Sequence, residues 1–411
     1  MKNFHCSLRI AISLVLLLPA IPLQAEEGKA KASWLDDFQF HGFVAQSYLH
    51  TSDNNFFGDS EDGSYEFQEF GLNTLWRSVA SLQVAAQLVA RDAGETDDGD
   101  LRFDYAFVDY AFLNSDTGNS GIRIGRVVNP YGFYNDTRDI AATRPSILLP
   151  QSIYFDVNRN FALSSDGVHF YHLAGDQNGY YNFQFGVFEP RTEDPDLEPA
   201  IFLLQIPGRP LPRGKLEGTT SWMGRLIYEY DLGRLRVGLT AAEVNVEYEP
   251  GQGDFYSDGD FQFRPYMLSL QYSRANWSAT MEYAKRTTEL RDFGMFLPDV
   301  KFTGTSYFVQ GTYRIAENWE VFARYDDLVW NDDDKDGKEV SKNTGGLLPG
   351  HSRYAKDWTY GARWDINQYL MLRLEWHQVE GTGWLSLLEN PDPTTTSKDW
   401  DLYAVSLSAR F

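Results

Sequence analysis

Strict alternation of apolar and polar residues recurs along almost the whole chain, and this pattern most constrains the fold. Clear examples are residues 82–91 (LQVAAQLVAR), 266–273 (YMLSLQYS) and 402–411 (LYAVSLSARF). A period of 2 puts successive side chains on opposite faces of a β-strand, and Val, Tyr, Phe and Trp favour strands. Beyond the N-terminal segment no stretch has a helical period, so the pattern predicts an all-β chain.

The connections between these segments alternate strictly in length. Short ones, such as residues 77–81 and 231–233, take turns with long ones, such as 50–64 and 331–353. Tight turns at one end and long loops at the other are typical of a transmembrane antiparallel β-barrel, whereas a soluble sandwich has no reason to segregate them. Counting gives about 16 strands, enough to enclose a water-filled channel.

The first 25 residues have the features of a secretory signal peptide. Lys2 and Arg9 precede an apolar run at residues 10–18, and small residues lead to a cleavage site near Ala25. Cys6 precedes the apolar run, which excludes a lipoprotein signal. The expected mature chain, 26–411, has a short periplasmic lead at 26–37 and then the barrel, with no run of about 18 apolar residues.

Composition agrees with a chain secreted into a membrane. Without Lys2 and Arg9, 34 basic residues face 58 acidic ones, a net charge of −24 that excludes nucleic acid as a partner. Aromatic residues reach 15%, which suits the interfacial girdles of a barrel in lipid. The rings beside short turns predict one such girdle: Trp76, Tyr110, Tyr230, Trp277, Tyr313, Trp319, Trp364, Tyr369 and Phe411.

Residues 129–166 form the longest passage without a period of 2, yet they are rich in Ile, Leu and aromatic residues. Because these side chains are too apolar for a free loop, we expect the passage to fold into the barrel mouth as a constriction loop. Pro130 and Gly132 would turn it inward. Five charged residues are expected to face its water path: Asp136, Arg138, Asp139, Arg144 and Arg159. Two alternatives stay open, a cap on a subunit interface and a plug of the lumen.

The last strand ends an apolar face on Phe411, and this resembles the assembly signal of bacterial outer-membrane proteins. The whole mature chain resembles a trimeric porin. The resemblance implies a homotrimer in the outer membrane of a Gram-negative bacterium, in contact with lipid and lipopolysaccharide, that passes small hydrophilic solutes. The passage from Arg123 to Gly132 is similar to the strand-to-loop junction of phosphate-selective-porin-like proteins, although the lysine-rich loop expected of a phosphate porin is not evident.

Strand parity predicts which charged residues line the lumen, because charge on the lipid face costs about 2–4 kcal/mol at mid-depth. The predicted set is Arg102, Arg123, Arg225, Arg286, Arg324, Arg363, Arg373, Glu282, Asp326 and Glu375. One interpretation is a rung of arginines that gives mild anion preference, with Arg324 and Arg373 as its test. The other is a lumen in which opposite charges cancel.

The long loops are acidic, and one of them carries a partial calcium-loop pattern at Asp332, Asp334 and Asp336. The position of the bidentate Glu is Asn343, so a solvated loop is the alternative. No cofactor is expected. The expected mature chain has six scattered histidines and no nucleophile motif, which predicts that it is not an enzyme. The competing function is a structural or adhesin barrel whose lumen is plugged by residues 129–166.

Overall fold

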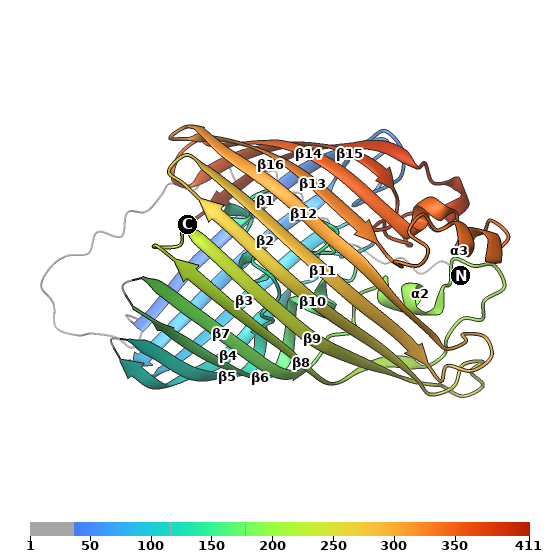
Figure 1. Cartoon of the computed structure of the whole chain (residues 1–411), viewed down its shortest axis with the longest axis horizontal. Coiled ribbons are helices and arrows are strands. Elements are labelled where there is room, and N and C mark those ends of the chain that lie inside the picture. The colour runs from blue at the N-terminus through green and yellow to red at the C-terminus, as the bar shows by residue number, and fades with distance from the viewer. Residues whose placement is uncertain (1–36, 116, 177) are drawn as a thin grey trace, which may run out of the picture. The chain divides into compact units, whose positions relative to one another are not determined.

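Sixteen antiparallel strands close into one barrel, in which each strand pairs with its neighbours in sequence and β1 pairs with β16 (Figure 1). This computed structural model describes residues 37–115, 117–176 and 178–411. The expected signal peptide, its cleavage near Ala25 and the lead up to residue 36 lie outside the described residues. The predicted all-β class and the count of about 16 strands are confirmed.

The strands are 11 to 17 residues long. Their bounds are β1 (Phe38–Thr51), β2 (Ser64–Val79), β3 (Leu82–Ala93), β4 (Arg102–Ser115), β5 (Gly118–Val128), β6 (Ser164–Gly175), β7 (Gly179–Glu189), β8 (Lys215–Tyr230), β9 (Leu235–Glu249), β10 (Gly259–Ser273), β11 (Trp277–Arg291), β12 (Val300–Ala316), β13 (Trp319–Val329), β14 (Tyr354–Asp365), β15 (Leu370–Gly381) and β16 (Asp399–Arg410). Short helices lie in the connections between strands: α1 (Arg159–Leu163), α2 (Leu197–Phe202), α3 (Lys338–Asn343), and the 3-10 turns η2 (Asn135–Thr137), η3 (Ala141–Thr143), η4 (Gly350–Arg353) and η5 (Pro393–Thr395).

Several strands continue beyond their predicted ends. The sequence pattern predicts a long connection at residues 191–218, but β8 begins at Lys215. β6 begins at Ser164, so the long β5–β6 connection covers residues 129–163 rather than 129–166. Strand ends outside the lipid have polar residues on both faces, so the period of 2 that marks a strand is lost there. Within the described residues, no helix has the length and apolarity needed to cross a membrane.

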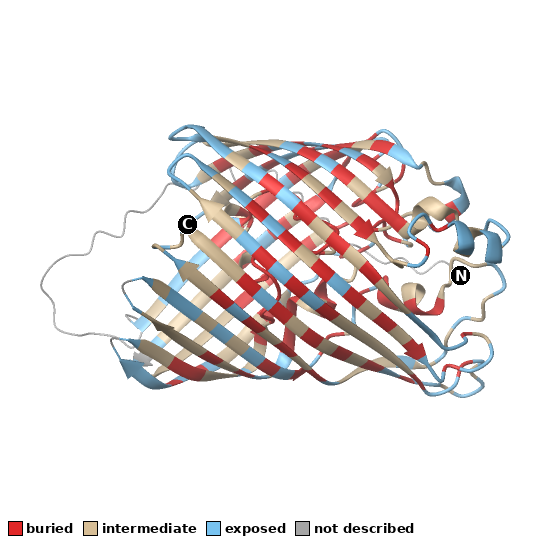
Figure 2. Cartoon of the chain, viewed as in Figure 1, coloured by how far each residue is buried: buried red, intermediate tan, exposed pale blue. Residues whose placement is uncertain are grey.

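Burial alternates along each strand, as Figure 2 shows for the wall facing the viewer. On β16, Tyr403, Val405 and Leu407 are exposed, whereas Ala404 and Ser406 between them are buried. The outward face is therefore apolar and suits lipid, and the inward face is covered by other parts of the chain. Exposed rings gather beside the short turns, at Tyr110, Tyr230, Trp277, Tyr313, Trp319, Tyr369 and Phe411.

Candidate functional site

The β5–β6 segment (residues 129–163) is the candidate site, and its two ends are joined to each other. The Asn129 amide donates to the Leu163 carbonyl (2.9 Å), and the Asn135 side chain donates to both the Asn129 and Leu163 carbonyls (2.9 and 3.0 Å). Gly132 has a φ of +56°, and a Cβ there would lie 2.2 Å from the Tyr154 hydroxyl. A glycine is therefore needed where the chain bends inward.

Inward-facing carboxylates of the wall accept hydrogen bonds from the backbone of this segment. Glu282 on β11 accepts from the Phe133 amide (2.9 Å), Asp326 on β13 from the Ser152 amide (3.2 Å), and Glu375 on β15 from the Leu148 amide (3.2 Å). Because these amides belong to no helix or sheet, the wall supplies the acceptors that secondary structure would otherwise provide. The path of the segment is therefore determined by side chains of distant strands.

Wall arginines bind the segment in a complementary way, by donating to its carbonyls. Arg225 on β8 donates to the Gly132 carbonyl (2.7 Å) and to Asp136 (2.6 Å). Arg324 donates to the Leu148 carbonyl (3.2 Å), and Arg373 to the Ala141 carbonyl (2.6 Å). Arginine suits this work because its planar guanidinium presents five donors in fixed directions.

Ion pairs fix the segment to the other side of the barrel. Arg144 pairs with Glu69 on β2, and Asp156 pairs with Arg91 on β3 (3.1 Å). In the closed order of sixteen strands, β3 and β11 are eight places apart, so Arg91 and Glu282 hold the segment from opposite walls. The segment thus touches the wall on both sides of the lumen.

A buried charge cluster lies where the segment meets β3. Arg91 binds Asp97 and Asp156, and Arg138 also binds Asp156 (3.3 Å). Burial opposes ionisation of Asp156, but the guanidinium groups of Arg91 and Arg138 outweigh it and lower the pKa of this carboxyl below its ordinary value. Removing one partner of such a cluster leaves an uncompensated buried charge, which costs about 3–5 kcal/mol.

Of the five charged residues expected along the water path, only Asp136 is exposed. Arg138, Asp139, Arg144 and Arg159 are buried, with 2–7% of their surface accessible. The expectation that they face the water path was therefore wrong for these four. The physical reason is that each finds a buried partner of opposite charge: Arg159 pairs with Asp139, Arg144 with Glu69, and Arg138 with Asp156.

The predicted lumen residues fall into two groups. Arg225, Arg286, Arg324, Arg373, Glu282, Asp326 and Glu375 are inward and at most 5% exposed. All but Arg286 bond to backbone or side chains of the segment, and Arg286 lies over the rings of Phe155 and Trp330. Arg102, Arg123 and Arg363 are partly exposed and pair with Asp97, Asp109 and Asp365. The wall arginines therefore form no free rung at the level of the segment.

Sequence reasoning missed three residues that hold the segment: Glu69, Arg91 and Tyr154. Arg91 stands at the inward parity of the predicted strand 82–91, and this signal could have found it. Glu69 likewise stands at the inward parity of β2, a strand whose alternation the sequence analysis did not single out. Tyr154 lies in a passage without a period of 2, so parity gave no signal for it.

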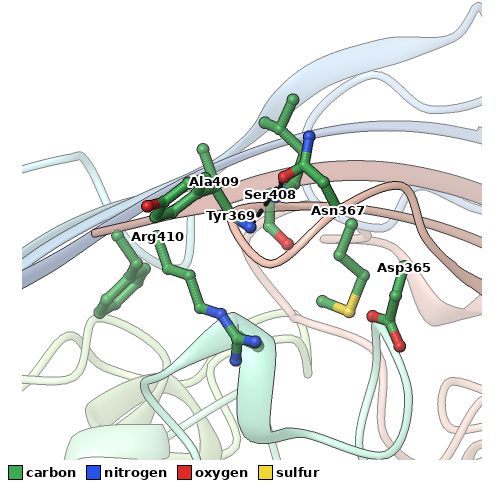
Figure 3. Close-up of a pocket in the computed structure, with 10 residues that line it drawn as sticks. Asp365, Asn367, Tyr369, Ser408, Ala409 and Arg410 are labelled. Atoms are coloured by element: carbon green, nitrogen blue, oxygen red, sulfur yellow. Dashed lines mark hydrogen bonds between the residues drawn. The ribbon is translucent and has the colours of Figure 1, made fainter. Parts of the chain in front are cut away.

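The lumen beyond the segment, at the short-turn end, is polar and open. An opening of about 490 Å3 there is lined by Arg77, Gln83, Asn114 and Asn119 among others. Thr143 and Asp136 expose the segment's own polar groups. A separate, small crevice is lined by Ala142 of the segment and by residues of β14, β15 and β16. Figure 3 shows Arg410 and Asp365 at this crevice, extending in the same direction.

The partial calcium pattern is not assembled. Asp332 accepts from Thr305, Asp334 accepts from the Glu339 and Val340 amides, and Asp336 pairs with Lys338. Within the described ranges no group of three or more His, Cys or acidic residues is arranged to hold a metal ion. The three carboxylates are used separately, one of them to cap α3.

Comparison with known proteins identifies the fold but no sequence family. No protein-family model and no curated protein matches the chain. The solved structure of the outer membrane channel DcaP of Acinetobacter baumannii is similar at a TM-score of 0.57 and 11% identity, covering 91% of this chain and 97% of that one. OprB of Pseudomonas putida gives 0.55 and 9%, covering 92% and 95%. An anion-selective porin from Comamonas acidovorans gives 0.53 and 12%, covering 91% and 99%.

The fold is that of bacterial outer-membrane porins. A closed wall suits this fold, because strands in lipid must satisfy every backbone group and closure leaves no unpaired edge. An apolar outside with a polar lumen is also typical of such barrels. Sequence identities of 9–12% establish similarity of fold and do not by themselves establish a shared function.

Proposed function

We propose that this protein is an outer-membrane channel for passive diffusion of small hydrophilic solutes, narrowed by the β5–β6 segment. The observation that carries the proposal is that the segment bonds to opposite walls while Asp136 and Thr143 remain exposed. A segment fixed from both sides leaves solutes only the space beside it. Trimeric assembly, implied by the porin resemblance, remains a prediction.

The test uses a cysteine at the exposed face of the segment. Thr143→Cys should let a bulky thiol reagent reduce single-channel conductance by at least half, because the added group would lie in the solute path. Asn343→Cys, exposed on α3, is the matched control and should react without a change. Steady conductance after complete reaction at residue 143 would contradict the constriction, and silence of the unmodified protein would contradict the channel.

We further propose mild anion preference, set at the short-turn end of the lumen. Arg77 and Arg314 are exposed there at inward positions, and no ion pair with a carboxylate is found for either among the described residues. Unpaired guanidinium groups in a polar lumen attract anions. Replacing both by Ala should move the reversal potential in a salt gradient towards cations, and an unchanged potential would reject this assignment.

A further inference from the structure

The loop between β7 and β8 (residues 190–214) reaches across the barrel at the end where the long loops gather. Asp196 in this loop accepts from the Ser386 hydroxyl (2.7 Å) and from the Leu387 and Leu388 amides (3.0 and 3.3 Å). Those residues belong to the β15–β16 loop (382–398). In the sixteen-strand order the two connections are eight strands apart in either direction, so this contact joins opposite sides of the mouth.

The β7–β8 loop also contacts the β5–β6 segment, through Asp194, two residues before Asp196. Asp194 accepts from the Asn160 amide (3.1 Å), the Asn160 side chain (2.9 Å) and the Phe161 amide (2.8 Å). Asn160 and Phe161 lie in α1, at the end of the β5–β6 segment. The loop therefore rests on the segment that crosses the lumen.

A third anchor follows Asp196. Phe202, at the end of α2, is fully buried among the rings of Tyr248, Tyr256 and Phe293, at centroid distances of 4.8, 4.6 and 5.5 Å. Tyr248 belongs to β9, Tyr256 to the β9–β10 loop and Phe293 to the β11–β12 loop. Residues 194–202 thus extend from the β5–β6 segment and the β9 wall to the opposite loop.

The three contacts of this loop, made by Asp194, Asp196 and Phe202, differ in how readily they can break. Withdrawing Phe202 would expose a large apolar surface, and withdrawing Asp194 would leave amides of α1 unpaired beneath the loop. Asp196 and Ser386 are each 1% exposed while the two loops are joined. No strand pairing connects these loops, so separating them would admit water, which can replace their mutual hydrogen bonds. The contact with the β15–β16 loop is therefore the one that can open while the others stay formed.

We propose that residues 194–202 are a lid across the long-loop mouth, latched by Asp196 to the β15–β16 loop, and that release of this latch opens the channel. This proposal rests on the proposed channel function. The lid would act on every solute that enters from the long-loop side, before the constriction.

A reversible cross-link tests the lid. The variant Asp196→Cys with Ser386→Cys is compared, oxidised and reduced, with Asn55→Cys with Asn390→Cys, a pair that joins neighbouring loops through a 2.8 Å bond from the Asn390 amide to the Asn55 carbonyl. Native cysteine does not interfere, because Cys6 lies in the expected signal peptide. Gel mobility under reducing and non-reducing conditions verifies each cross-link.

Single-channel conductance should fall at least tenfold when the 196–386 pair is oxidised and should return on reduction, whereas the 55–390 pair should conduct equally in both states. Equal conductance of the oxidised and reduced 196–386 variant would overturn the lid and leave the channel intact. Silence in both states, and in the 55–390 variant, would overturn the channel and the lid with it.

Single substitutions give a second measurement that needs no cross-link. Asp196→Ala should increase the fraction of time spent in the open state several-fold over the unmodified protein, and Asp196→Asn, which keeps one acceptor oxygen, should fall between them. Identical open fractions in all three proteins would also reject the latch.

Discussion

The Tyr154 hydroxyl donates to Glu282 across 2.6 Å, joining the β5–β6 segment to the centre of β11. The same hydroxyl accepts from the Phe133 and Tyr134 amides (2.8 and 3.1 Å), and Glu282 accepts from the Phe133 amide as well. One tyrosine therefore ties the two limbs of the segment to each other and both to the wall.

Tyr154→Phe should destabilise the barrel by about 1–3 kcal/mol, because it leaves two amides and a buried carboxylate short of partners. We expect lower resistance to urea and noisier, larger conductance steps. Tyr131→Phe is the matched control: Tyr131 is also a buried tyrosine of the segment, but its hydroxyl has no hydrogen-bond partner among the described residues. Equal unfolding midpoints for the two variants would contradict the role given to Tyr154.

Arg373→Ala should weaken the attachment of the segment rather than change ion selectivity. Its guanidinium donates to the Ala141 carbonyl (2.6 Å) and, at longer range, to the Ser146 carbonyl (3.4 Å), and these acceptors would be left buried and unpaired. We expect a loss of about 2–4 kcal/mol in urea unfolding. Arg363→Ala, which removes a partly exposed pair with Asp365, should cost less than about 1 kcal/mol. A selectivity change in Arg373→Ala at unchanged stability would restore the idea of an arginine rung.

Deletion of Phe411 should reduce the amount of protein in the outer membrane. Its amide donates to the Gly42 carbonyl (3.0 Å) and its carbonyl accepts from the Gly42 amide (3.1 Å), at the seam where β1 meets β16. The ring covers Gly42, where a Cβ would lie 2.3 Å from it. Fractionation measures the outcome against Phe411→Tyr, which keeps the ring and both backbone bonds. Normal membrane levels of the truncated chain would show that the seam closes without this residue.

The contact between the β1–β2 and β15–β16 loops should strengthen as the pH falls. Burial raises the pKa of Glu389 from its ordinary value of 4.5 to about 7, while the carboxyl accepts from the Phe57 and Gly58 amides (2.9 and 2.6 Å). The docked carboxyl binds its proton more tightly than a carboxyl in water. Docking is therefore favoured at the lower end of the window between about pH 4.5 and 7 and weakened as the pH rises through it.

Hydrogen exchange of the Phe57 and Gly58 amides measures this dependence. Protection factors, corrected for the intrinsic effect of pH on exchange, should be higher at pH 5.5 than at pH 8. In Glu389→Gln, which has no proton to lose, they should be the same at both values. A protection factor that rises with pH in the unmodified protein would contradict the sign.

The wall of this barrel could be predicted from the sequence because a strand is defined locally. Each strand has its own alternation, and its turn lies within a few residues, so Leu82, Tyr266 or Leu402 can be assigned to the lipid or lumen face from neighbours alone. The same parity predicted that Arg225, Arg324 and Glu282 face inward, and all three are buried.

What the inward residues do was decided only by the tertiary structure. The β5–β6 segment has no period, and its path follows bonds to Glu69, Arg91, Glu282 and Arg373, which lie on four other strands of the barrel, β2, β3, β11 and β15. Closure of β1 on β16 brings these charges around one lumen, where a buried arginine is stable only with acceptors nearby. The sequence by itself determined the alternation that gives each strand two faces, and the closed barrel decided that most of the charges predicted to face inward hold the segment rather than face the water path.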